Sequence, residues 1–117
     1  MHEMSIAVSL VEQLQRVAAE HRATRITAVE VECGVLQQIV PEALELAFTA
    51  AAVDTVAQGA TLNIVAQRLV VRCRSCGTEF AAEIDDYLCP RCQTADVAVV
   101  TGRDIVLKSV TCETEDR

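Results

Sequence analysis

The sequence predicts an α+β fold: a small three-stranded sheet covered by two helices, with an inserted zinc-ribbon-like module that carries four cysteines. Three observations support this prediction. The 117 residues are 51% hydrophobic, which is enough apolar surface for one domain with a core. Segments with helical and with extended hydrophobic patterns alternate along the chain. Two CxxC pairs interrupt this alternation before the last extended segment.

The first element is an amphipathic helix over residues 3 to about 22. Ile6, Leu10, Leu14 and Val17 follow one another at spacings of three or four residues, so they share one face of a helix. Polar and charged residues occupy the opposite face. The stripe therefore predicts a helix that packs with one side against the sheet.

An extended segment follows over residues 26–33. Its apolar residues Val29, Val31 and Cys33 alternate with two glutamates, which is typical of a strand with one buried face. Gly34 directly follows this segment and is expected to end the strand. The sequence therefore predicts the first strand of the sheet here.

A second helix is expected to start at Pro41 and to run to about Ala57. Proline is favoured at the first position of a helix, and the acidic Glu42 and Glu45 are favoured in its first turns. Gly59 is the expected helix stop. This segment is the second of the two helices that we expect to cover the sheet.

The second half of the chain contains three more extended segments, at residues 60–72, 97–100 and 105–110. We expect the last of them to return to the sheet, which makes the cysteine segment an insertion. The predicted organisation is an α/β domain formed by residues 1–67 and 98–117, and a cysteine module formed by residues 68–97.

The strongest motif is a pair of cysteine turns, Cys73-Arg-Ser-Cys76 and Cys89-Pro-Arg-Cys92, separated by twelve residues. A CxxC turn places two thiolates on one edge of a tetrahedron, and a loop of this length brings the second pair to the opposite edge. Four thiolates leave no open coordination position, so the predicted zinc site is structural. Metal binding then supplies the folding free energy of this short segment, on the order of 10 kcal/mol.

Other interpretations of the cysteines stay open at this point. One CxxC pair is enough for a thiol redox centre, and the same four ligands also hold an iron–sulfur cluster. The remaining two cysteines have simpler interpretations: Cys33 is expected to be a buried apolar residue at a strand end, and Cys112 an exposed thiol.

The composition disfavours nucleic acid as a partner, because the chain carries 17 acidic and 10 basic residues and a net charge of -7. Only three aromatic residues are available to stack on bases. Four arginines lie in or beside the cysteine module, at positions 68, 72, 74 and 91, but four acidic residues offset them. A zinc-ribbon module that binds proteins or nucleic acid is therefore the second hypothesis.

The compartment is expected to be the cytoplasm. The chain enters a helical pattern directly after Met-His-Glu, without the basic start and apolar stretch of a secretory signal. It contains no run of about 18 apolar residues, so we expect no membrane span. In a reducing compartment, paired cysteines more often bind metal than form disulfides.

The N-terminus offers a second metal site. The amine of Met1, the amide nitrogen of His2 and its imidazole can form adjacent chelate rings around one ion, and Glu3 can add an amide nitrogen or a carboxylate. Nitrogen ligands in a plane suit Ni(II) or Cu(II) better than Zn(II). A histidine near a terminus is by default a solvated residue, so the spacing alone leaves both interpretations open.

Taken together, these segments resemble the hydrogenase nickel-incorporation protein family, HypA/HybF. The resemblance covers essentially the whole chain in order. It rests on the Met-His-Glu-Met-Ser start, the two CxxC pairs and three further segments, at residues 34–46, 59–64 and 102–105. Gln93 departs from the pattern, since many members carry glycine after the last cysteine.

The resemblance implies a nickel metallochaperone with no catalytic residues. The α/β domain of residues 1–67 and 98–117 would be the nickel-binding domain and would hold nickel through His2, with Met1 and Glu3. The module of residues 68–97 would be the zinc-binding module and would hold zinc through Cys73, Cys76, Cys89 and Cys92. The client would be the large-subunit precursor of [NiFe]-hydrogenase, served together with the GTPase HypB, and in some organisms urease. Neither nucleic acid nor membrane is an expected partner. The oligomeric state stays open, with a homodimer as one option.

Overall fold

The computed structural model describes residues 2–114 of the chain. These residues form two compact units, each built from segments that are far apart in the sequence. Within the described residues, unit 1 comprises residues 2–31, 39–64 and 107–114, and unit 2 comprises Glu32–Gln38 and Val65–Val106. The predicted division into a nickel-binding domain and a zinc module concerns function and stays a prediction.

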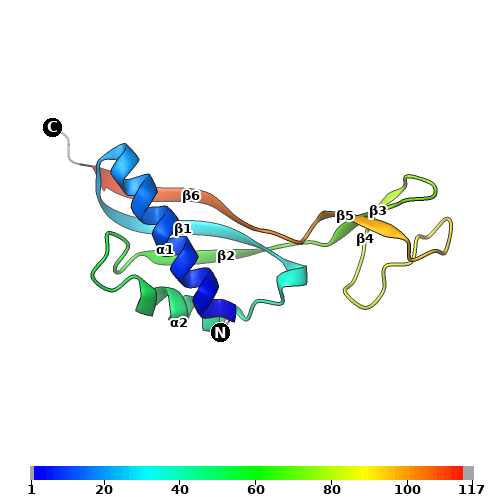
Figure 1. Ribbon diagram of the computed structural model, residues 1–117, viewed down its shortest axis with the longest axis horizontal. Helices are drawn as coiled ribbons and strands as arrows, with labels where there is room; N and C mark the ends of the chain where they lie inside the picture. The colour runs from blue at the N-terminus through cyan, green and yellow to red at the C-terminus, as the bar shows by residue number, and fades with distance from the viewer. Residues whose placement is uncertain (1, 115–117) are drawn as a thin grey trace. The chain divides into compact units, whose positions relative to one another are not determined.

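The helices and strands confirm the predicted α+β class, with two helices and a three-stranded sheet of the order β2-β1-β6 (Figure 1). The last strand does return to the first sheet, as expected. The two helices are α1 (His2–His21) and α2 (Pro41–Ala51). The strands of this sheet are β1 (Ala23–Gly34), β2 (Thr61–Gln67) and β6 (Ile105–Thr114). A short 3-10 helix, η1 (Val35–Gln37), follows β1.

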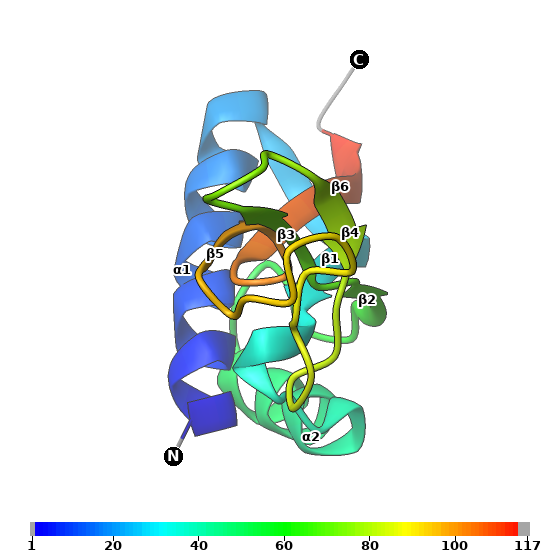
Figure 2. The same cartoon turned by 90° about the vertical axis from the view of Figure 1, so that its right-hand side faces the viewer.

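The core of unit 1 lies between the two helices and β1. The apolar stripe of α1 is buried as predicted at Leu10 and Leu14, whereas Ile6 and Val17 are half-buried. Five side chains of β1 and α2 complete this core: Ile26, Val29, Val31, Leu44 and Phe48. Figure 2 shows α2 beside the N-terminal part of α1. Neither helix combines the length and hydrophobicity needed to cross a bilayer.

The second helix is shorter than predicted and ends at Ala51. Asp54 takes a left-handed conformation with φ of 63°, which an α-helix does not allow. The hydroxyl of Thr55 bonds the carbonyl of Ala52 at 2.7 Å, and the carbonyl of Val56 accepts a bond of 2.9 Å from the amide of Ile26. Turn bonds and a bond to β1 therefore replace the helical ladder in this segment.

Unit 2 contains a second sheet that the sequence did not predict, with the order β4-β3-β5. Its strands are β3 (Val70–Cys73), β4 (Glu79–Ala81) and β5 (Val97–Thr101). The expected extended run over residues 60–72 is thus divided into β2 and β3 at residues 68 and 69. Both partners of β3 are antiparallel, and Val71 lies opposite Phe80 on one side and Val99 on the other.

Three backbone segments of unit 2 cross closely at Gly34 and Gly102. A Cβ atom on Gly34 would lie 2.3 Å from the carbonyl carbon of Gly102, and a Cβ on Gly102 would lie 2.8 Å from the Cα of Leu69. The amide of Gly34 bonds the carbonyl of Asp104 at 2.8 Å, and that of Leu36 bonds the carbonyl of Gly102 at 2.9 Å. At positions 34 and 102 only glycine fits this crossing, which joins the ends of the cysteine module to the end of β1.

Candidate metal centre

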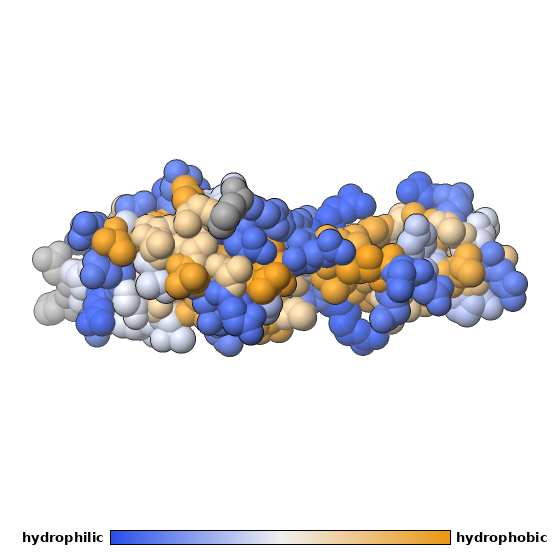
Figure 3. Space-filling view, turned by 90° about the horizontal axis from the view of Figure 1, so that it is seen from below, coloured by the Kyte–Doolittle hydropathy of each residue, from blue (hydrophilic) through white to orange (hydrophobic). Residues whose placement is uncertain are grey.

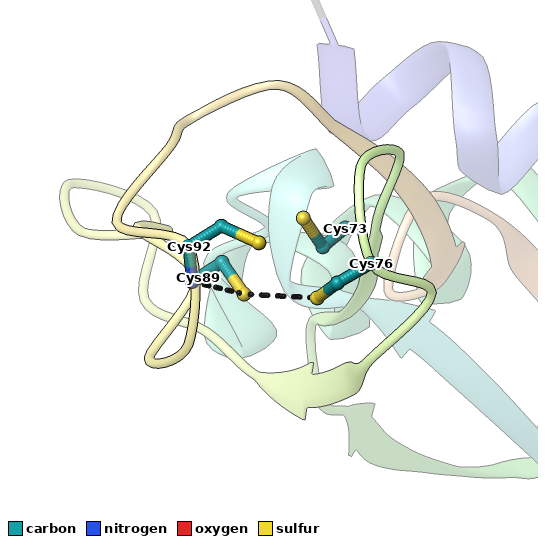
Figure 4. A group of neighbouring side chains, drawn as sticks. All are labelled: Cys73, Cys76, Cys89 and Cys92. Atoms are coloured by element: carbon teal, nitrogen blue, oxygen red, sulfur yellow. Dashed lines mark hydrogen bonds between the residues drawn. The ribbon is translucent and has the colours of Figure 1, made fainter.

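The four predicted cysteines lie together at one end of β3 and in the loop before β5. The Sγ atoms of Cys73, Cys76, Cys89 and Cys92 all lie within 4.8 Å of one another. Figure 4 shows the two side chains of each turn pointing toward those of the other turn. The first cysteine of each turn is buried and the second is exposed. Each turn therefore contributes one buried and one exposed cysteine to the cluster.

The spacing of the sulfur atoms fits a tetrahedral metal site. The Sγ atoms of Cys76 and Cys89 are 3.7 Å apart. A zinc ion with Zn–S bonds of about 2.3 Å requires an S···S edge of about 3.8 Å. This distance is far longer than a disulfide bond, so the geometry favours a shared ion over a pair of disulfides.

The two turns repeat the same backbone hydrogen bonds. In the first turn, the amide of Cys73 bonds the carbonyl of Thr78 at 2.9 Å, and the amide of Gly77 bonds the carbonyl of Cys73 at 2.9 Å. In the second turn, Cys89 bonds Thr94 at 2.9 Å and Gln93 bonds Cys89 at 2.8 Å in the same way. Each CxxC segment is thus closed by the residues that follow it.

The residue after each second cysteine takes a left-handed conformation, with φ of 78° at Gly77 and 57° at Gln93. The two turns therefore have one design, although only the first has glycine in this position. The CxxC spacing alone did not reveal this repeat, although the sequence does contain a longer shared pattern. Both segments read C-x-x-C-x-T, with Thr78 and Thr94 in equivalent positions.

Hydrogen bonds to the sulfur atoms differ between the turns. The backbone amides of Arg91 and Cys92 point at the Sγ of Cys89, each at 3.4 Å. In the other turn the Sγ of Cys76 lies 3.1 Å from the hydroxyl oxygen of Thr78. Amide and hydroxyl groups in these positions stabilise thiolates, which are the form that binds metal.

The protonation of two cysteines is coupled across the cluster. Hydrogen bonds from the side chain and backbone of Thr78, and then from Cys92, lower the pKa of Cys76 to about 6. The hydrogen bond with Cys76, and then desolvation, raise the pKa of Cys92 to about 12. Without metal, the two thiols therefore share one proton at neutral pH.

Two arginines of the module are held by acidic partners. Arg72 forms an ion pair with Glu79, and the Nε of Arg74 lies 3.2 Å from the Oδ1 of Asp96. The amide of Arg74 also bonds the carbonyl of Asp96 at 3.0 Å. These pairings weaken the hypothesis that the arginines form a surface for nucleic-acid phosphates.

At the N-terminus, His2 is exposed and begins α1, whereas Met1 lies outside the described residues. An oxygen of the Glu3 carboxylate accepts a hydrogen bond of 3.3 Å from the amide of Val40, the residue before α2. This bond is the main cause that lowers the pKa of Glu3. The Glu3 side chain therefore links the start of α1 to the start of α2.

The two other cysteines do not belong to the cluster of four. Cys33 is buried near the end of β1, as expected, and its burial raises the pKa of the thiol. Cys112 in β6 is half-buried, so the expectation of an exposed thiol was wrong. Its place in a paired strand explains the difference.

Comparison with known proteins identifies one family. Residues 1–112 match the family described as "HypA: Hydrogenase/urease nickel incorporation, metallochaperone, hypA". The matched range includes the Met-His-Glu start and both CxxC pairs.

Individual relatives match over nearly their whole length. The hydrogenase maturation factor HypA of Chlorobium limicola is 40% identical over 116 residues, which are 99% of this chain and 100% of that protein. The hydrogenase maturation factor HypA of Aquifex aeolicus is 36% identical over 115 residues, 98% of this chain and 100% of that protein. The solution structure of the Ni metallochaperone HypA from Helicobacter pylori has a TM-score of 0.76 at 26% identity, covering 98% of this chain and 100% of that chain.

Proposed function

We propose, because this chain belongs to the HypA family of hydrogenase and urease nickel-incorporation metallochaperones, that it binds one Ni(II) ion at its N-terminus and delivers it for maturation of [NiFe]-hydrogenase. The observation that carries this proposal is the family match over residues 1–112, which includes the N-terminal motif and the four cysteines. The chain acts as a carrier and not as an enzyme.

The proposed nickel ligands are the imidazole of His2, the amine of Met1 and backbone nitrogens at the start of α1. The exposure of His2 supports this assignment, because a carrier must exchange its ion with partners. Backbone nitrogens of a first helical turn also lie outside the hydrogen-bond ladder of the helix. Amine, amide and imidazole nitrogens in one plane are a ligand set that suits Ni(II).

Glu3 belongs to the proposed ligand set in one of two ways. Its backbone nitrogen extends the planar chelate without disturbing the contact with Val40. Its carboxylate binds nickel either through the oxygen that the Val40 amide does not contact, or through the contacted oxygen after the bond with Val40 breaks. Binding through the backbone nitrogen keeps this bond between the starts of α1 and α2 during loading.

The proposed zinc ligands are Cys73, Cys76, Cys89 and Cys92. The spacing of their sulfur atoms supports a tetrahedral ion, and four protein ligands leave no position for a substrate. Zinc here holds the two cysteine turns together, and nickel delivery uses the other site. We propose the GTPase HypB and the large-subunit precursor of the hydrogenase as partners, and the cytoplasm as the site of action.

The decisive experiment is a nickel titration of untagged protein by calorimetry, with zinc quantified by elemental analysis. We expect His2→Ala to weaken nickel binding at least about tenfold while the zinc content stays at one ion per chain. His21→Ala is the matched control, because His21 is also exposed and lies at the opposite end of α1. Equal nickel affinity of the two variants would remove the nickel site from the N-terminus.

Two further measurements separate the ligands. An added residue before Met1 turns the amine into an amide, so the extension should weaken nickel binding as His2→Ala does. Both the amine and the imidazole must be deprotonated to bind nickel, so the affinity should fall as the pH is lowered below neutrality. A nickel affinity that is flat from about pH 8 to about pH 6 would contradict this ligand set.

Delivery is tested in cells that lack their own copy of this gene. The wild-type chain should restore hydrogenase activity at trace nickel, and His2→Ala should restore it only when excess nickel is supplied. Restoration by His2→Ala at trace nickel would show that delivery does not use this site.

A further inference from the structure

We propose that unit 2 carries a docking surface around the Glu83–Asp86 turn for a protein segment that presents a large apolar side chain next to lysine or arginine. The surface lies within one compact unit. It is defined by its own side chains and does not depend on nickel binding at the N-terminus.

Two hollows meet at this surface and share Leu69 and Ile84. The larger, of about 540 Å³, is lined by residues that include Val35, Arg68, Glu83 and Asp85. The smaller, of about 260 Å³, is lined mainly by apolar side chains, among them Leu36, Val71, Val97 and Val99, and by Tyr87. Together they offer an apolar pocket beside a larger one with a mixed polar and apolar lining, and the larger has the size of a typical ligand pocket.

The turn exposes large apolar side chains. Ile84 is 40% exposed, Tyr87 42% and Leu88 55%, all within five consecutive residues. The turn is held in place by two reciprocal backbone bonds between Glu83 and Asp86, of 3.0 and 3.1 Å. A fixed turn that keeps apolar side chains in solvent is typical of an interaction site. Figure 3 shows hydrophobic and hydrophilic side chains side by side over the part of unit 2 around β4.

Charge decides which partner fits. Glu83, Asp85 and Asp86 are all exposed, and none of them forms an ion pair with a side chain in residues 2–114. Arg68 supplies one positive charge in the larger hollow, so the surface keeps a negative balance. A partner with lysine or arginine beside its apolar anchor complements this field and associates faster.

The same charges argue against other occupants. A second copy of the chain would bring an identical set of three carboxylates against this one, which is repulsive. Phosphate groups of nucleic acid or of anionic lipids would be repelled for the same reason. A cationic, apolar protein segment is the occupant that satisfies both halves of the surface.

The test uses zinc-loaded full-length chain and a short fluorescein-labelled peptide in which leucines are flanked by lysines. Binding is followed by fluorescence anisotropy at physiological salt. We expect the peptide to bind, and its counterpart with glutamate in place of lysine to bind at least about tenfold more weakly. Equal binding of both peptides, or no binding of the lysine peptide, would overturn the proposal.

Matched variants locate the site. Glu83→Gln with Asp85→Asn should weaken peptide binding about tenfold, whereas Glu12→Gln with Glu20→Gln, which removes two exposed charges from α1, should leave it unchanged. Ile84→Ser should weaken binding, and Val8→Ser, at a residue of α1 that is 43% exposed, should not. Equal effects of the two charge pairs would show unspecific attraction to an acidic protein and overturn the proposal.

Two controls keep the result interpretable. Zinc content and amide spectra show whether each variant is folded, and amide shifts of the wild type on peptide addition should centre on residues 82–88. Shifts that centre on unit 1 would overturn the proposal. A dimer in light scattering that Ile84→Ser dissociates would assign this surface to self-association and would also overturn it.

Discussion

Gly77 and Gln93 occupy the same position in two equivalent cysteine turns, and both take a left-handed backbone conformation. A side chain in this conformation is strained by roughly 1–2 kcal/mol, which glycine avoids. The first turn is therefore relaxed, whereas the second turn carries a residue that its backbone does not favour.

The first prediction concerns these two residues. Gly77→Ala should lower the free energy of unfolding by about 1 kcal/mol, and Gln93→Gly should raise it by a smaller amount, because added freedom of the unfolded chain offsets part of the gain. Urea unfolding of zinc-loaded protein measures both. A loss of stability in Gln93→Gly would show that the Gln93 side chain makes a contact worth more than the strain.

The second prediction concerns Thr78 in metal-free protein, under conditions where amide spectra show that the two cysteine turns are retained. Removing the hydroxyl in Thr78→Val should raise the pKa of Cys76 from about 6, because the side-chain hydrogen bond is the largest cause of its low value. The alkylation rate of Cys76 at pH 7, followed by mass spectrometry, should fall accordingly. Thr94→Val is the control, since its hydroxyl oxygen accepts a bond from the amide of Asp96 and, within residues 2–114, bonds no cysteine sulfur. Equal alkylation rates in the two variants would contradict the assignment.

A third prediction follows for the pH dependence of zinc binding. The pKa of Cys92 is raised to about 12, so at neutral pH zinc must displace its proton, and zinc affinity should rise with pH. The pKa of Cys76 is lowered to about 6, so below this pH a further proton competes and the affinity should fall more steeply. Chelator competition across pH 5 to 8 measures this curve. A slope that stays constant through pH 6 would not agree with a low pKa of Cys76.

The fourth prediction concerns Glu3, whose pKa is lowered mainly by the bond from the Val40 amide. A carboxyl with a lowered pKa in the folded chain stabilises the fold above its unfolded pKa of about 4.3. This contribution is lost as the pH falls through the lower folded value. Thermal unfolding of Glu3→Gln should therefore depend less on pH in the acid range than that of the wild type. Glu12→Gln, at an exposed position of α1, should keep the wild-type dependence.

The fifth prediction concerns the crossing of Gly34 and Gly102. Gly34→Ala should lower the free energy of unfolding by about 3 kcal/mol or more, because its Cβ meets backbone atoms that cannot move aside. Gly59→Ala is a fitting comparison. The φ of Gly59, 82°, is unfavourable for alanine, whereas that of Gly34, -62°, is not; the nearest atom to the Cβ at position 59 is an arginine side-chain nitrogen at 4.0 Å. Its cost should therefore be only about 1 kcal/mol. Similar losses in both variants would mean that the crossing is not rigid.

Local pattern was enough to predict the features that depend on neighbours in the sequence. The spacing of Leu10 and Leu14 predicts the buried face of α1, because a helix repeats every 3.6 residues. The spacing of the four cysteines likewise predicted a common site, because a CxxC turn constrains its two thiols locally. The fold class follows from the order of these segments.

Only the tertiary structure decided which distant segments pair. β5 joins β3 in a second sheet, and the left-handed Asp54 and the bond of Val56 to Ile26 end α2 early. The link between Glu3 and Val40 also spans 37 positions. A strand or a carboxylate carries the same hydrogen-bonding groups whichever partner it finds, so periodicity does not reveal that partner. Which segments pair is determined by the folded chain as a whole, because all of its buried backbone N–H and C=O groups must find hydrogen-bond partners together.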